Sequence, residues 1–170
     1  MTRREARELA FVLLFESTFT DEYVRDILES AREARDVEAD AFALALAEGT
    51  QEHQRELDEL ISRFSLKWSK NRLSRVALSL LRLASYEMLY EKDIPVSVSI
   101  NEAVELAKKY GGDDDSAFIN GVLGGLARSG LVAGGEADKQ PDGDKQPDGD
   151  KQPDEDKQPD GDKLSVGDAP

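Results

Sequence analysis

The stretch that decides the fold class runs Ile94-Pro-Val-Ser-Val-Ser-Ile-Asn-Glu-Ala-Val-Glu-Leu-Ala-Lys-Lys-Tyr110. Its first half alternates apolar residues with proline and serine, which by periodicity alone indicates a β-strand. The chain contains no second strand candidate, and an unpaired strand would leave its backbone N–H and C=O groups unsatisfied. Ser99-Ile-Asn-Glu102 also has the spacing of a helix capping box. We therefore expect an extended lead, then a helix ending near Tyr110, with Gly111 in the left-handed conformation that closes it.

The other periodic segments before residue 130 have helical spacing, so we predict an all-α domain. Thr2-Arg-Arg-Glu5 forms another capping box. The helix that follows carries apolar side chains on two faces over residues 6–15, so it must be covered from more than one side. Further helices are expected over about 21–34, over about 37–61 with an interruption at Gly49, and over about 71–90. A last helix opens at Asp113-Asp-Asp-Ser116, where acidic residues suit the positive helix end.

Composition excludes several classes of protein. The 170 residues include no cysteine and a single histidine, which removes disulfides, thiolate metal sites and histidine-rich zinc sites. No apolar run approaches the roughly 18 residues of a membrane helix, and the start of the chain lacks the apolar region of a signal peptide. We therefore expect a cytoplasmic protein with no membrane partner.

The C-terminal segment 134–170 differs from the rest of the chain. It contains four successive hexapeptides close to Asp-Lys-Gln-Pro-Asp-Gly and almost no apolar side chains. Such a segment buries too little surface to offset its ordering entropy, so we predict a disordered acidic tail after a folded domain of residues 1–133. The formal charge of the chain is −14, of which the tail contributes half. Because the remaining domain is also acidic, any nucleic acid must bind a local basic patch.

No catalytic constellation, cofactor motif or metal-ligand cluster is visible, so we do not expect an enzyme. Residues 113–115 are read as a solvated helix cap rather than a cation site, and His53 as an exposed surface residue. Two basic clusters remain. Arg3, Arg4 and Arg7 begin the first helix, where they either grip a phosphodiester backbone or are neutralised by neighbouring glutamates. A second cluster, from Arg63 to Arg82, surrounds Trp68, which stacks on single-stranded nucleic acid or, as we favour, anchors a helix junction.

Four stretches together resemble the NusB family of transcription antitermination factors. Two are Arg3-Arg-Glu-Ala-Arg7-Glu, which leads into Leu-Leu-Phe15-Glu, and Leu81-Arg-Leu-Ala-Ser-Tyr-Glu87-Met. The more specific two are the stretch that begins at Ile94 and Phe118-Ile-Asn-Gly-Val-Leu123. The resemblance covers roughly residues 2–128. It implies an all-helical fold of two packed helical bundles.

The resemblance also implies a function. Members of the family pair with the ribosomal protein NusE, bind the single-stranded boxA sequence of ribosomal RNA leaders, and join the transcribing RNA polymerase complex. Carried over by position, the RNA-binding residues are Arg3, Arg4, Arg7, Asp114 and Phe118, and the NusE-binding residues are Phe15 and Glu87. Phe118 is equally well explained as ordinary core packing.

The sequence leaves one alternative open. The two apolar faces of residues 6–15 would also suit a homodimeric protein-interaction module without RNA specificity. One departure from the family pattern bears on RNA binding: Glu5 stands where many relatives carry another base, so we expect weak RNA affinity from this protein alone.

Overall fold

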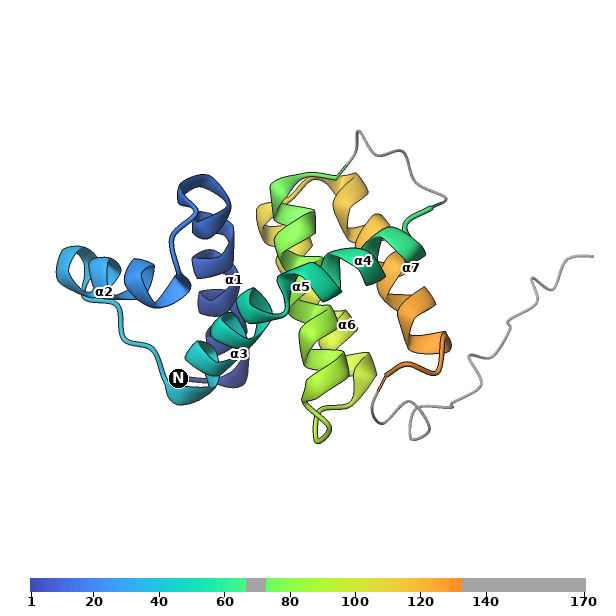
Figure 1. Cartoon of the computed structure of the whole chain (residues 1–170), viewed down its shortest axis with the longest axis horizontal. Helices are drawn as coiled ribbons and strands as arrows, with labels where there is room; N and C mark the ends of the chain where they lie inside the picture. The colour runs from blue at the N-terminus through green and yellow to red at the C-terminus, as the bar shows by residue number, and fades with distance from the viewer. Residues whose placement is uncertain (67–72, 133–170) are drawn as a thin grey trace, which may run out of the picture. The chain divides into compact units, whose positions relative to one another are not determined.

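The computed structural model describes residues 1–66 and 73–132, and these contain seven helices and no strand. The predicted all-α fold is therefore confirmed for the described part of the chain. Segment 134–170, with its predicted disorder, lies outside the described residues, as does Trp68. In chain order the helices are α1 (Arg3–Thr20), α2 (Val24–Arg35), α3 (Ala41–Glu52), α4 (Gln54–Phe64), α5 (Arg75–Tyr90), α6 (Val96–Tyr110) and α7 (Asp113–Arg128) (Figure 1).

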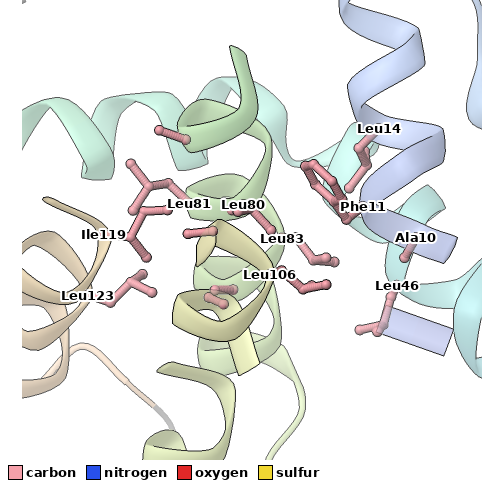
Figure 2. Close-up of a cluster of buried hydrophobic side chains, with 14 of the residues drawn as sticks. Ala10, Phe11, Leu14, Leu46, Leu80, Leu81, Leu83, Leu106, Ile119 and Leu123 are labelled. Carbon is pink, nitrogen blue, oxygen red and sulfur yellow. The ribbon is translucent and has the colours of Figure 1, made fainter. Parts of the chain in front are cut away.

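The helices form two packed groups, as the resemblance implied. Helices α1, α2 and α3 contact one another, and α5, α6 and α7 pack together with α4 against α5 and α7. The groups meet where α1 and α3 contact α5 (Figure 1). Figure 2 shows this junction: Phe11 and Leu14 of α1 point toward α5, which on its other side faces Ile119 and Leu123 of α7. Burial of this continuous apolar core is the main stabilising contribution to the fold.

Helix α1 begins with the predicted capping box. The backbone N–H of Glu5 donates to Thr2 Oγ1 at 3.2 Å, and the Thr2 N–H donates to Glu5 Oε2 at 2.6 Å. The two apolar faces of this helix are covered within the chain, because α1 packs against α2, α3 and α5 at once. The two-sided pattern of residues 6–15 therefore needs no second copy to cover it, and the sequence argument for a homodimer loses its main support.

The prediction for residues 94–100 is wrong in its details. Helix α6 begins at Val96, directly after Pro95, so the alternating segment is helical rather than extended. Proline suits this position because its fixed φ matches a helix start and its missing N–H would be unpaired there. Ser99 does not cap the helix but lies buried inside it. Gly111 has φ −106° and ψ −174°, which is extended and not left-handed, and the chain passes directly into α7.

The expected long third helix is two helices that meet at His53. His53 is half-buried rather than exposed, which corrects the sequence prediction. Its Nδ1 lies 2.8 Å from the carbonyl oxygen of Gly49 and therefore donates to it, and its ring centroid lies 4.5 Å from that of Tyr90 and 5.6 Å from that of Tyr86. Gly49 is helical, and its missing side chain makes room for Tyr86: a Cβ there would lie 2.2 Å from the Tyr86 hydroxyl.

None of the helices in the two described ranges is long and apolar enough to cross a membrane.

Candidate nucleic-acid interface

Two exposed arginines occupy the first turn of α1. Arg3 and Arg4 are the first two residues of the helix, which the Thr2 cap holds in place. Figure 1 shows that this end of α1 lies beside the start of α3. The first-turn N–H groups of a helix and two guanidinium groups together favour an anion. The structure thus presents the first two members of the predicted arginine cluster at the surface.

Arg4 is engaged by an acid of α6. Its Nε and Nη2 atoms donate to the two carboxylate oxygens of Glu102 at 3.1 and 2.8 Å. This bond raises the pKa of Arg4 and, with the nearby charge of Arg7, lowers the pKa of Glu102. Arg4 is 69% exposed in its side chain, so the pair is open to solvent on the arginine side. A phosphate that binds Arg4 must therefore compete with Glu102.

Arg3 is held differently. Its guanidinium carbon lies 3.8 Å from the ring centroid of Phe42, the second residue of α3. Within residues 1–66 and 73–132, no carboxylate or carbonyl accepts a hydrogen bond from this guanidinium. Its donors therefore face solvent and are free to bind a ligand.

Arg7 is buried, which corrects the expectation that it faces phosphate. It is 6% exposed, and its ion-pair partner Glu87 of α5 is 1% exposed. The Arg7 Nε bonds both carboxylate oxygens of Glu87, and Nη2 bonds one of them at 2.7 Å. Ser99 of α6 donates a further bond to the same carboxylate at 2.9 Å. The pair ties α1 to α5 and α6, so in this conformation Glu87 offers no surface to a protein partner either.

The three aspartates at the start of α7 have different roles. Asp115 closes the helix start: its Oδ2 accepts from the Gly112 N–H at 3.1 Å and from Ser74 Oγ at 3.2 Å. Asp113 and Asp114 are exposed. In the described part of the chain no group of three or more His, Cys, Asp or Glu side chains could hold a metal ion.

Phe118 does not present a stacking face. It is 6% exposed and belongs to the apolar core, so of the two readings left open by the sequence the core reading is correct. The reason is its position on the inner side of α7, one residue before the fully buried Ile119. An aromatic contact to RNA at this surface would have to come from another residue.

Asp114 and the exposed arginines lie at different levels along α6. Arg4 contacts Glu102 at the middle of that helix, whereas α7 begins just beyond Tyr110 at its end. From Glu102 to Tyr110 the helix rises about 12 Å along its axis. At the end of α6, Lys109 and Tyr110 hydrogen-bond Glu8 of α1, and these bonds lower the pKa of Glu8. An extended strand of a few nucleotides could span this distance.

Two of the three described members of the second basic cluster, Arg75 and Arg82, are engaged by contacts inside the protein. Arg82 forms a two-point ion pair with Asp58, with Nε–Oδ1 at 2.7 Å. Arg75 lies over the ring of Phe19 at 4.3 Å and donates to the carbonyl oxygen of Thr18, so it closes the end of α1. Arg63 is exposed, and the remaining members, Lys67, Lys70 and Arg72, lie outside the described residues.

The predicted partner residue Phe15 is half-buried on α1. Its ring centroid lies 5.9 Å from that of Phe11, inside the core, and 5.1 Å from that of Phe19, which is 60% exposed. Phe15 therefore forms the inner part of an aromatic row that reaches the surface at the end of α1.

The comparisons with known proteins agree with this architecture. The model of the NusB family matches residues 4–128. The chain belongs to the NusB family. It is 44% identical over 126 residues to the transcription antitermination protein NusB of Bacillus subtilis, covering 74% of this chain and 95% of that protein. It is 38% identical to the NusB of Clostridium novyi, covering 76% of this chain and all of that protein.

Solved NusB structures share the fold. A structure of T. maritima NusB superposes with a TM-score of 0.70 at 38% identity and covers 81% of this chain and 98% of its own. The crystal structure of antitermination factors NusB and NusE in complex with dsRNA matches with a TM-score of 0.63 at 27% identity, covering 74% of this chain and 97% of that chain. The NusB fold is thus shown over the described domain, and the chain is a member of a transcription antitermination family.

Sequence reasoning missed one residue at this surface. Phe42 has no signal of its own in the sequence, because residues 41–47 are all apolar and nothing in their spacing relates Phe42 to residue 3. Only the packing of α1 against α3 brings the Phe42 ring under the Arg3 guanidinium.

Proposed function

We propose that this NusB-family protein binds single-stranded boxA RNA of ribosomal RNA leaders together with NusE, and that the complex joins the transcribing RNA polymerase to suppress premature termination. The observation that carries the proposal is the pair of exposed arginines on the first turn of α1, in a chain whose relatives are named transcription antitermination proteins. Further support comes from the solved relative that holds NusB, NusE and RNA in one complex.

The exposed arginines supply the phosphate contacts in this proposal. Arg3 offers an unoccupied guanidinium, and Arg4 exchanges Glu102 for a phosphate oxygen. Arg7 acts indirectly, because its bonds to Glu87 hold α1 in place. The strand then follows the surface toward Asp114 at the start of α7. Remote acids matter little, because the Debye length at physiological salt is about 8 Å.

The partner contact is proposed at Phe15. NusE would bind the aromatic row at the outer end of α1. Phe15 and Phe19 lie about 18 and 24 Å from Arg3 along the helix, so the two ligands would contact one helix without overlapping. We expect binding of one ligand to favour the other, because both contact the same helix.

The proposal is tested by titrating the full chain with boxA RNA and with a scrambled RNA, with and without NusE, at several salt concentrations. Replacing Arg3 and Arg4 together by alanine should weaken boxA binding and reduce the slope of log affinity against log salt by about one to two. The matched control replaces Arg25 and Arg35, two exposed arginines of α2 that also pair with glutamates. The control should bind RNA as the parent does.

The NusE part of the proposal has its own readout. Phe15→Ala should weaken NusE binding and remove the gain in RNA affinity that NusE confers, while RNA affinity without NusE stays at the parent value. Equal affinity of the parent for boxA and scrambled RNA, or equal salt slopes for parent and arginine variant, would contradict the proposal. A stable homodimer that ignores both ligands would favour the alternative reading.

A further inference from the structure

The Arg3 guanidinium lies over the Phe42 ring, a contact that phosphate binding does not require. We propose that Phe42 holds the Arg3 guanidinium as a flat platform on which one unpaired nucleobase of the RNA stacks. This inference rests on the proposed RNA-binding function and adds a base-contacting residue, with a second residue that positions it.

The Arg3 guanidinium is in direct contact with the Phe42 ring. The Arg3 guanidinium carbon lies 3.8 Å from the Phe42 ring centroid, which is van der Waals contact distance, so one side of the guanidinium rests on the ring. Arg3 is exposed, so the other side faces solvent. A planar guanidinium stacks on nucleobases as readily as on aromatic rings. A base on the outer side would complete a three-layer stack without moving either residue.

The position of Phe42 is fixed from several sides. The first turn of α3 is capped by Asp40, whose carboxylate accepts from the Ala43 N–H at 2.8 Å. The Phe42 ring is half-buried and packs against the apolar core. The guanidinium carbon of Arg7 lies 5.8 Å from the same ring centroid, and Arg7 is itself held by Glu87. The ring that supports Arg3 is thus anchored to the interior, which favours a preorganised platform.

The surroundings favour a base over other flat ligands. Arg4 follows Arg3 in the chain and supplies the phosphate contact that a neighbouring nucleotide needs. The aromatic residue that the sequence offered for stacking, Phe118, is buried. Recognition of single-stranded RNA combines a positive track with stacking on aromatic or guanidinium planes, and the first turn of α1 offers both.

The protein contains a matched stack at the other end of α1. Arg75 lies over Phe19 at 4.3 Å, but its guanidinium also donates to the Thr18 carbonyl. Phe19 is sixteen residues from Arg3, or about 24 Å along the helix. The Arg75–Phe19 pair therefore repeats the chemistry of the Arg3–Phe42 pair outside the proposed RNA path.

The test measures binding of boxA RNA to the full chain without NusE, using RNAs in which single adenines are replaced by the fluorescent base 2-aminopurine. Arg3→Lys keeps the charge and removes the plane, so it should lower affinity about 5- to 100-fold with an unchanged salt slope. Phe42→Leu should lower affinity similarly, and Phe42→Tyr should retain it. One 2-aminopurine position should be quenched by the parent and by Phe42→Tyr but not by Arg3→Lys.

Arg75→Lys is the control, and it should bind and quench as the parent does. Thermal melts establish that each variant is folded at the assay temperature, and Arg3→Lys, a change at an exposed site, keeps the test decisive even where Phe42→Leu is unstable. Parent-like affinity and quenching in Arg3→Lys would overturn the stacking inference, while a weakened Arg3→Ala/Arg4→Ala variant would leave the proposed function standing. Absence of boxA binding by the parent would overturn both.

Discussion

Arg7 and Glu87, 80 residues apart in the sequence, form a buried ion pair with three hydrogen bonds between α1 and α5. Ser99 of α6 contributes a fourth bond to the carboxylate. A buried charge without its partner is strongly unfavourable, because the protein interior solvates it poorly. The pair therefore specifies how the first helical group docks on the second, and with it where Arg3 and Arg4 are presented.

Removing one member of this pair should destabilise the fold severely. Glu87→Ala or Arg7→Ala should lower the free energy of unfolding by about 3–5 kcal/mol, measured by urea denaturation. The double variant Arg7→Met/Glu87→Leu should lose much less than the sum of the single changes, because neither charge is left unpaired. Arg25→Ala, which breaks an exposed pair with Glu48, is the control and should leave the midpoint nearly unchanged. Additive losses in the double variant would show that the two groups do not depend on each other.

Removing the acid that competes for Arg4 should strengthen RNA binding. Glu102→Gln keeps the shape of the side chain but removes its charge, so Arg4 no longer exchanges an ion pair for a phosphate. We expect a gain in boxA affinity of about 2- to 5-fold, the size of a surface ion pair, measured by fluorescence anisotropy. Glu48→Gln removes the α3 partner of Arg25 and should leave boxA affinity unchanged. A weaker Glu102→Gln variant would mean that Arg4 must be held by Glu102 in order to bind.

Replacing Asp114 and replacing Asp115 at the start of α7 should have different effects. Asp114→Asn removes an exposed negative charge beside the proposed RNA path and should strengthen boxA binding. Asp115→Ala removes the side chain that caps Gly112 and bonds Ser74, and should cost about 0.5–2 kcal/mol of stability in thermal or urea unfolding. Unchanged RNA affinity in Asp114→Asn would place the strand away from this end of α7.

The Glu8 contact with Lys109 and Tyr110 should make stability depend on pH. These bonds lower the pKa of Glu8 below its unfolded value of about 4.3, so the folded state binds fewer protons at acidic pH. The contribution of the contact is therefore complete above about pH 5 and is lost as the pH falls through the depressed folded pKa. Glu8→Gln should melt below the parent at pH 7, and the difference should shrink toward pH 3. Glu33→Gln, at an exposed position of α2, is the control and should show no such convergence.

Replacing Gly49 by alanine should destabilise the protein, although alanine has the higher helix propensity. In an exposed helix interior Gly→Ala gains about 0.5–1 kcal/mol, but a Cβ at Gly49 would lie 2.2 Å from the Tyr86 ring, so Gly49→Ala should cost about 1–3 kcal/mol. Gly124→Ala in α7 is the control: its Cβ would meet only the end of the flexible Arg128 side chain, at 3.2 Å. Thermal melts should move in opposite directions for the two variants. A stabilised Gly49→Ala would show that Tyr86 moves freely.

Local patterns predicted the helices well where the interactions are local. The Thr2–Glu5 capping box is present because it needs only the four residues that form it. The prediction of an extended segment over residues 94–100 was wrong because alternation over a few residues does not distinguish a strand from a helix with serine on its buried face. Ser99 is buried because Glu87, twelve residues earlier, supplies the acceptor that its hydroxyl needs.

The residues predicted to bind RNA show the same division. The sequence indicated Arg3, Arg4 and Arg7 together, since all three lie in the first two turns of one helix. The structure separates them: Arg3 rests on Phe42, Arg4 bonds Glu102, and Arg7 is buried. Phe118 was ambiguous in the sequence because a phenylalanine satisfies both a core and a stacking surface.

The sequence by itself determined the all-helical class, the family and the position of the basic helix start, because caps, helical periodicity and family motifs are properties of short segments. Only the tertiary structure decided which of the predicted binding residues face solvent. Burial depends on which helices pack together, and that packing joins Arg7 to Glu87 and Arg3 to Phe42 across distances in the chain that no local pattern records. A charge buried beside its counter-charge and a charge exposed to a ligand have the same sequence signature. Their different surroundings make the first stabilise the packing of helices and leave the second available to a ligand.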